Sequence, residues 1–465
     1  MAIVPIVIGA SNSQGTVYLY GDPAAGTVAV GPLPKLGDGS VWGDPGEPSG
    51  AGLLFQLQTT SKGTKTFLQA QADGTVALTG SQSDDGTHWL AIPVHGAKTF
   101  KIFSTGGKQD GKYLALTGDT LGFVDGIDSG TVWTIAPAID LDALGGLISQ
   151  YGPIIYHDTA EQYKMCSVEW FLDKATLYDK KTGTSIKSPS VDQLPATLDP
   201  DDKTRYSLNL DPSAKPGAPE TARAYVHALV GFDHIDLQFW RFYAYNGPGT
   251  CWVKQTFIAG GASGSASLAP LGEHWGDWEL VVIRIDTATQ QPIGVWLSQH
   301  NSGIWYGKDQ LGQLQKEGDK FVFYASRNGH ATYAGTGNNP SEVHDYGALL
   351  WKLHFELWNT TSKGDRFDCG ADAAIIATDL VDWAPPVPNW VNYPYRWGPV
   401  DTSSSITPES VDQLLYAILG PLGVFAGGLG FGYMAATLAS FFKQDDINGP
   451  EGPITKTATW AGAYS

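Results

Sequence analysis

Apolar and polar residues alternate along much of this chain, and the alternation predicts β-strands far more often than helices. Strand candidates recur at short intervals between residues 150 and 400 and are separated by turns rich in Gly, Pro and Asn. The candidates are residues 224–229, 235–245, 278–285, 293–298 and 320–325. This spacing is typical of a β-sandwich with long loops.

The first 140 residues repeat one apolar skeleton three times, at intervals of about 45 to 50 residues. Each unit opens on an aromatic residue followed by leucine, at Tyr18-Leu19, Phe67-Leu68 and Tyr113-Leu114. Each closes on an aromatic residue with an aliphatic residue two positions later, or three in the second unit, at Phe55-Gln56-Leu57, Trp89-Leu90-Ala91-Ile92 and Trp133-Thr134-Ile135. Three copies predict a pseudo-threefold barrel, and the pattern resembles the β-trefoil of ricin-type lectins.

The sequence therefore predicts a mainly β protein in three parts. These are a lectin-like β-trefoil at 1–140, a β-sandwich at 150–405, and an apolar helical segment with a tail packed on the sandwich at 406–465. Residues 413–442 contain no charged residue, and this stretch exceeds the roughly 20 residues that cross a bilayer as a helix. Pro421 and several glycines interrupt it, so membrane insertion and two short core helices both stay open.

Charge and cysteine content narrow the choice of partners. A net charge of −18 leaves no basic stripe to neutralise phosphates, which argues against nucleic acid and favours cations. Three widely separated cysteines cannot form a disulfide framework. The first residues lack a basic, cleavable signal, so we expect synthesis in the cytoplasm of the producing cell.

The segment Glu273-His274-Trp275-Gly276-Asp277-Trp278-Glu279 carries the clearest candidate chemistry. Asp277 and Glu279 are two positions apart on a predicted strand, so they share a face, and His274 in the preceding turn is expected to fold over it. One imidazole and two carboxylates suit a divalent cation such as Mg²⁺, Ca²⁺ or Mn²⁺. The alternative is a hydrogen-bonded polar cluster at the start of a strand.

Five ordered blocks resemble the vacuolar protein sorting-associated protein 62 family. They are residues 151–172, 238–248, 272–279, 297–300 and 326–333, with further matches at 395–399 and 449–450. This resemblance covers roughly residues 150–460 and implies an architecture more than an activity.

Residues 272–279 are also similar to the Gly-His-Arg-His-Asp-Trp-Glu segment of necrosis- and ethylene-inducing-peptide-like cytolysins. In that family a β-sandwich holds a divalent cation that helps to recognise sphingolipid sugar head groups. By position the resemblance implies a metal site of His274, Asp277 and Glu279, with Asn246 where the family has an aspartate. Two positions depart from the pattern: Glu273 at the first, and Gly276 where the family has a second histidine.

Further candidate residues lie in turns and at strand ends. His300, His330 and Tyr333 are predicted to line a cleft, with a structural role for each histidine as the alternative. In the trefoil, Asp73, Asp110 and Asp119 are candidate glycan ligands, although aspartates are common in turns for backbone reasons alone.

These features favour a protein that recognises glycans or glycolipids and acts on target-cell membranes, as a defence, cytolytic or insecticidal toxin. Its expected partners are a cell-surface glycan or glycolipid and the membrane surface, where an oligomer is one open outcome. The alternatives are a metal-dependent hydrolase that uses the same site and a non-catalytic trafficking factor. We expect binding more than catalysis, because no nucleophile motif is evident in the sequence.

Overall fold

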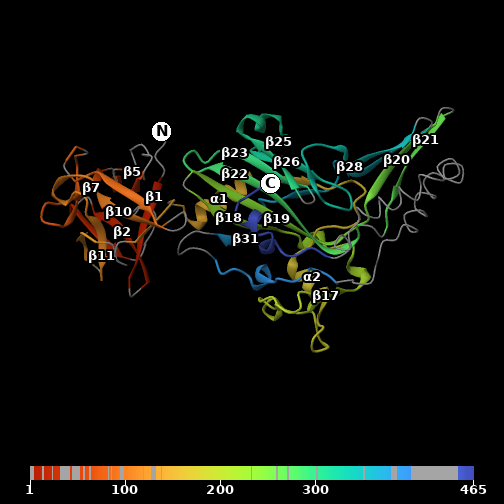
Figure 1. Cartoon of the computed structure of the whole chain (residues 1–465), viewed down its shortest axis with the longest axis horizontal. Coiled ribbons are helices and arrows are strands. Elements are labelled where there is room, and N and C mark those ends of the chain that lie inside the picture. Colours follow the sequence, from red (N-terminus) through yellow and green to blue (C-terminus); the bar gives the residue numbers. More distant parts are fainter. Residues whose placement is uncertain are drawn as a thin grey trace.

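The computed structural model describes most of the chain, and the architecture is mainly β (Figure 1). The described residues are 5–12, 15–22, 25–31, 42–43, 53–55, 58–61, 64–81, 83–84, 86–94, 99–118, 120–126, 132–137, 139–231, 233–257, 260–269, 272–299, 302–348, 351–378, 385–399 and 449–464. Figure 1 shows strands β1–β13 at one end of an elongated molecule and the longest strands near its middle.

The N-terminal strands form one antiparallel network in which the first strand pairs with the last. The network comprises β1 (Pro5–Asn12), β2 (Gly15–Asp22), β3 (Thr27–Gly31), β4 (Trp42–Gly43), β5 (Leu53–Phe55), β6 (Gln58–Ser61), β7 (Thr64–Ala70), β8 (Val76–Thr79), β9 (Trp89–Pro93), β10 (Thr99–Ser104), β11 (Tyr113–Thr117), β12 (Thr120–Val124) and β13 (Trp133–Pro137). Its own apolar core includes Ile8, Leu19, Leu68, Ile102 and Leu114.

Three buried tryptophans mark the threefold repeat of this part. The indole Nε1–H groups of Trp42, Trp89 and Trp133 donate to the carbonyl oxygens of Leu19, Leu68 and Leu114, at 2.9, 3.1 and 2.9 Å. All three tryptophans are fully buried. The same bond recurs once in each unit, so the predicted threefold repeat is confirmed.

One detail of the predicted repeat was wrong. The closing aromatic residue of the first unit is Trp42 and not Phe55, because Phe55 lies in β5, which pairs with β9 of the second unit. Trp42 is easy to miss in the sequence, since its strand has only two residues and the neighbouring sequence is rich in Gly and Pro.

A six-stranded sheet organises the second half of the chain, in the order β24-β23-β22-β19-β18-β31. Its strands are β18 (Ala224–Val230), β19 (His234–Asn246), β22 (His274–Asp286), β23 (Pro292–Gln299), β24 (Ser302–Gly307) and β31 (Ala373–Thr378). The predicted strands in this region are confirmed, although β22 begins earlier than expected. His274 therefore lies in the strand itself, opposite Asn246, and not in a turn before it.

A second sheet covers one face of this central sheet and makes the sandwich. It contains β14 (Ile154–Tyr156), β25 (Lys316–Glu317), β26 (Lys320–Ala325), β27 (Thr332–Tyr333) and β30 (Arg366–Asp368). Phe239 and Ile283 of the central sheet share an apolar core with Phe323 of β26. Helix α1 (Leu141–Tyr151) closes the same core, and the Asp140 side chain caps it by accepting from the backbone N–H of Ala143.

The opposite face of the central sheet is buried as well. Trp240, Trp278 and Val282 pack there with α2 (Val168–Lys174) and with Trp390 and Trp397. A small sheet of β15 (Ala175–Asp179), β16 (Thr184–Lys187) and β17 (Tyr206–Leu210) contributes to this layer. Burial on both faces explains the unbroken apolar run of residues 280–283 in β22.

A four-stranded sheet, in the order β21-β20-β29-β28, projects beyond the sandwich (Figure 1). It is formed by β20 (Thr250–Phe257), β21 (Gly260–Ser267), β28 (Gly337–Ala348) and β29 (Trp351–Thr361). Short helices complete the described elements: η1 (Gly107–Gln109), η3 (Val191–Gln193), η4 (Pro212–Ala214), η5 (Pro219–Thr221), η6 (Lys308–Gln313), η7 (Asn389–Asn392), η9 (Pro453–Thr455) and α5 (Thr457–Trp460).

The apolar segment 413–442 lies outside the described residues. Within the part of the chain that the structure describes, no helix has the length and apolarity needed to cross a membrane. The proposed limits of the three parts, at 1–140, 150–405 and 406–465, stay a prediction.

Candidate functional site

The four predicted metal ligands lie at one end of the two longest strands. Asn246 ends β19 and His274 opens β22, and the two residues face each other across the strand pair. Asp277 and Glu279 follow on β22, opposite Tyr243 and Arg241 of β19. Both carboxylates are buried, at 7% and 8% exposure. The alternation along β22 gives them the same face as Val281 and Ile283, toward the second sheet.

Hydrogen bonds fix one polar atom of Asn246 and one of His274. The Asn246 side-chain amide donates to the carbonyl oxygens of Gly247 and Gly272, at 3.0 and 2.6 Å. His274 Nδ1 donates to the carbonyl oxygen of Gly276 at 2.8 Å. Burial lowers the pKa of His274, so its ring is neutral and its Nε2 carries a lone pair.

The two carboxylates are fixed in a similar way. Asp277 Oδ2 accepts from His330 Nδ1 at 2.9 Å, and Glu279 Oε2 accepts from the Ser298 hydroxyl at 2.7 Å. Among the described residues, no hydrogen bond reaches the remaining acceptor atom of any predicted ligand. These atoms are Asn246 Oδ1, His274 Nε2, Asp277 Oδ1 and Glu279 Oε1.

The chemistry of these atoms fits a hard divalent cation, which takes carboxylate, amide and imidazole donors. Metal ligands are commonly oriented by hydrogen bonds to their other polar atom, as all four side chains are here. In the described ranges, however, no group of three His, Cys, Asp or Glu side chains is close enough to hold an ion. The cation site therefore stays a prediction.

His330 is the centre of the hydrogen bonds around Asp277. It is fully buried, and its second ring nitrogen, Nε2, donates to the Tyr163 carbonyl oxygen at 3.0 Å and lies 3.7 Å from Glu161 Oε2. Burial alone would lower the pKa of His330, but the hydrogen bonds and charges of Asp277 and Glu161 outweigh it and raise the pKa to about 9. His330 is therefore a buried imidazolium at neutral pH.

Glu161 balances this charge, a role that was not predicted from the sequence. Its Oε1 accepts from the backbone N–H of Tyr163 at 2.7 Å, and its Oε2 accepts from that of Asn328 at 2.6 Å. Burial opposes ionisation, but His330 and these two N–H groups lower the pKa of Glu161 to about 2. The carboxylate therefore stays charged and joins the 158–163 loop to the 326–331 loop.

Arg241 is a second buried cation beside the carboxylates. Its guanidinium is fully buried and donates to the Tyr243 hydroxyl at 3.1 Å and to the Thr332 hydroxyl at 2.5 Å. The Tyr243 hydroxyl also lies 2.9 Å from His157 Nε2. Burial, together with the positive charges of Arg241 and His330, lowers the pKa of His157 to about 3, so His157 is neutral.

We use the name polar cluster for the side chains that these contacts connect between the two sheets. They are His157, Glu161, Arg241, Tyr243, Asp277, Glu279, Ser298, His330 and Thr332. Burial and the charge of Asp277 raise the pKa of Glu279 to about 7. The cluster therefore presents a carboxyl group that can take up or release a proton near neutral pH.

Gly276 explains why the second histidine of the cytolysin segment has no counterpart on this strand. Its φ is +64°, a left-handed conformation that favours glycine, and a Cβ added there would collide with the carbonyl oxygen of Trp397. An imidazole does lie beside Asp277, that of His330, which is more than fifty residues further along the chain.

Of the other predicted site residues, three lie in the described part of the chain and two do not. Tyr333 is buried in β27, and His300 and Asp119 lie outside the described residues. Asp73 and Asp110 are exposed, and Gln109 joins their turns by donating to the carbonyl oxygens of Gln71 and Ala72. Asp73 also accepts from the backbone and hydroxyl of Thr75, the turn role that was its alternative.

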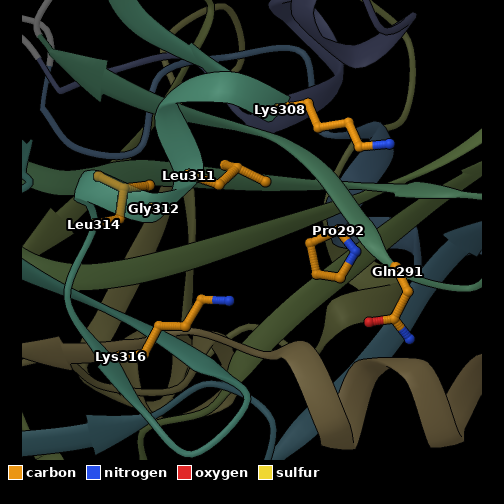
Figure 2. Close-up of a pocket in the computed structure, with 7 residues that line it drawn as sticks. All are labelled: Gln291, Pro292, Lys308, Leu311, Gly312, Leu314 and Lys316. Carbon is orange, nitrogen blue, oxygen red and sulfur yellow. The ribbon is translucent and has the colours of Figure 1, made fainter.

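A separate pocket of about 450 Å³ lies at the other end of the central sheet, where β23 begins (Figure 2). Figure 2 shows Pro292, Leu311 and Leu314 among its walls, with the side chains of Lys308 and Lys316 at its margins. It shares no residue with the polar cluster.

The fold and site define a protein with a threefold N-terminal barrel and a sandwich that encloses a polar cluster. The sequence pattern of the vacuolar protein sorting-associated protein 62 family matches residues 134–422, more than half of the chain. This chain therefore belongs to that family. No curated protein matches it.

Several solved structures are similar to parts of the chain. The structure of SeviL bound to asialo-GM1 saccharide is 14% identical, with 30% of this chain and 99% of that chain covered and a TM-score of 0.23. Necrosis and ethylene inducing protein 2, from the causal agent of cocoa's witches' broom disease, is 16% identical, with 41% and 67% covered and a TM-score of 0.22. A structure described as a toxin fold for microbial attack and plant defense is 15% identical, with 50% and 75% covered and a TM-score of 0.24.

Proposed function

We propose that this chain recognises glycans or glycolipid head groups on target-cell membranes and acts there as a defence protein of the cytolytic or insecticidal kind. In this proposal a divalent cation is held by Asn246, His274, Asp277 and Glu279. The observation that carries it is that each of these side chains has one polar atom hydrogen-bonded and one acceptor atom left over.

The surroundings of Glu279 support a bound cation. Glu279 has no ion pair with Lys, Arg or His within the described ranges, although it is buried near Asp277. These surroundings raise its pKa to about 7, which means that its charged form is disfavoured. A divalent cation would offset that cost by attracting both carboxylates, and would lower the pKa of Glu279.

The N-terminal part supplies a second point of attachment in this proposal. Asp73 and Asp110 are exposed on neighbouring turns of the trefoil, where carboxylate oxygens can accept hydrogen bonds from sugar hydroxyls. Two weak sites on one chain raise the overall affinity for a surface that displays both ligands.

A metal-dependent hydrolase that uses the same cation site is the second candidate function, and His330 favours it. Its imidazole donates to Asp277, a predicted ligand, at 2.9 Å, so a side chain that can move protons lies beside the site. The two functions give different products, because a hydrolase releases a cleaved head group while a recognition protein leaves the lipid intact.

Dye-loaded vesicles of phosphatidylcholine, with and without a glycosphingolipid, test the proposal. We expect the full chain to release dye only from glycolipid vesicles with Ca²⁺ present, and EDTA to stop the release. Asp277→Asn, which keeps the size of the side chain but removes its charge, should abolish leakage. Glu220→Gln is the matched control because Glu220 is an exposed carboxylate on η5.

Leakage that is equal with and without glycolipid, or equal in EDTA, would overturn the proposal. Cleaved head groups, measured by mass spectrometry in the same samples, would favour the hydrolase.

A further inference from the structure

The projecting four-stranded sheet has an aromatic and polar face outside the polar cluster. Residues directly opposite each other on neighbouring strands share a face, and the pairs here are Trp252 with Glu356, Lys254 with His354, and Thr250 with Trp358. We use the name indole face for the surface formed by Trp252, Lys254, Asp345, Lys352, His354, Glu356 and Trp358.

The two indoles form a pair on this surface. The rings of Trp252 and Trp358 are stacked, with centroids 5.6 Å apart and planes inclined by 8°. Both side chains are half-buried, whereas Cys251, Val253 and Phe355 on the other face of the same sheet are buried. The sheet therefore packs through its other face, and the two tryptophans remain partly accessible to a ligand.

Polar side chains surround the indole pair. His354 lies between two carboxylates, with Nδ1 2.8 Å from Asp345 Oδ1 and Nε2 2.8 Å from Glu356 Oε1. The second oxygen of Glu356 accepts from the Trp358 indole at 2.5 Å. Exposed serines of β21 add hydroxyl groups, because Ser265 is opposite Trp252 and Ser267 is opposite Thr250.

The indole face has no net negative charge. Hydrogen bonds that His354 donates to Glu356 and Asp345 raise the pKa of His354, which favours its positive form. With Lys254 and Lys352 on the same face, the cations offset both carboxylates. The three cations outnumber the two carboxylates and would repel a quaternary ammonium ligand, although aromatic rings attract such groups, so an uncharged ligand fits this face better.

We propose that the indole face binds a neutral saccharide. The apolar C–H face of a pyranose ring packs on the indoles of Trp252 and Trp358, and its hydroxyl groups bond to Asp345, Glu356 and the serines of β21. The inference rests on the proposed function only for the class of ligand. It uses neither the cation site nor the trefoil, so the indole face is a third sugar site, independent of the other two.

An array of neutral animal, fungal and plant glycans, probed with the fluorescently labelled full chain in EDTA, tests this site. We expect a set of glycans to be bound in the presence of the chelator. Trp358→Ala should lower their signal by about tenfold, the effect of losing an aromatic packing surface. Trp358→Phe should keep most of the signal because the ring is retained.

Tyr178→Ala is the matched control, because it removes an exposed aromatic ring from β15, away from the indole face. Thermal unfolding of each variant shows whether the fold is kept, and Trp252→Phe provides a milder change should Trp358→Ala fail to fold. The proposal is overturned if no neutral glycan binds, or if Trp358→Ala binds as the unmodified chain does. Failure of the vesicle experiment alone leaves this inference standing, because the array contains neither membrane nor free cation.

Discussion

The imidazole of His330 lies flat against the ring of Tyr243, with centroids 3.7 Å apart and planes inclined by 6°. The same imidazole contacts Asp277 on one side and the backbone of Tyr163 on the other. One side chain from the loop between β26 and β27 therefore connects both long strands of the central sheet to the 158–163 loop.

This arrangement predicts that stability declines in mild alkali. The pKa of His330 is about 9 in the folded chain against an ordinary value of 6.5. Because the folded value is the higher one, the stabilisation is complete below pH 6.5 and is lost as the pH rises through about 9. We expect the free energy of unfolding to fall across this range.

His330→Asn is the variant that checks this prediction. His330 has a φ of +54°, and asparagine tolerates this left-handed conformation better than most residues. The variant should be less stable near pH 6.5 and should show a smaller decline toward pH 9 in urea unfolding. Equal pH slopes for the two proteins would contradict the buried imidazolium.

Gly276 provides a test of backbone geometry beside the site. Gly276→Ala should lower the free energy of unfolding by about 3 kcal/mol, because a left-handed alanine costs about 1 to 2 kcal/mol and its Cβ would also meet the Trp397 carbonyl. Gly145→Ala in α1 is the control, since nothing lies within 4 Å of its added Cβ. We expect the control to be neutral or slightly stabilising in thermal unfolding.

The three indole bonds of the trefoil should be equivalent in energy. Trp89→Phe removes the donor to the Leu68 carbonyl and leaves that buried oxygen unpaired, at an expected cost of about 1 to 3 kcal/mol. Trp42→Phe and Trp133→Phe should give losses of the same size in the urea transition of the trefoil. A loss confined to one of the three would show that the threefold repeat is not reflected in stability.

The strands were predictable from the sequence because the alternation of apolar and polar residues in a strand can be recognised from a few neighbouring positions. The period of two in β22 places Asp277 and Glu279 on one face regardless of the rest of the fold. The threefold repeat was also predictable from its leucines, whereas Trp42 was missed because its strand is only two residues long.

The composition of the polar cluster was not predictable in this way. Glu161 and His330 meet only because β14 and β26 are adjacent in the second sheet, and no local pattern reveals a parallel pairing across so many residues. Arg241 lies in an apolar run that predicts a buried strand. Nothing in that run predicts that its guanidinium lies beside carboxylates. Trp390 and Trp397 pack on the opposite face of the central sheet but lie far from its strands in the sequence, so no local pattern predicted this layer.

In the proposed function, Asn246, His274, Asp277 and Glu279 share one divalent cation. Anomalous difference density from crystals soaked in MnCl₂ tests this claim, because Mn²⁺ scatters anomalously and takes the same oxygen and nitrogen donors. We predict one strong peak at about 2 to 2.5 Å from Asp277 Oδ1 and Glu279 Oε1, and its loss in Asp277→Asn. A well-ordered polar cluster with no peak beside these atoms would contradict the claim.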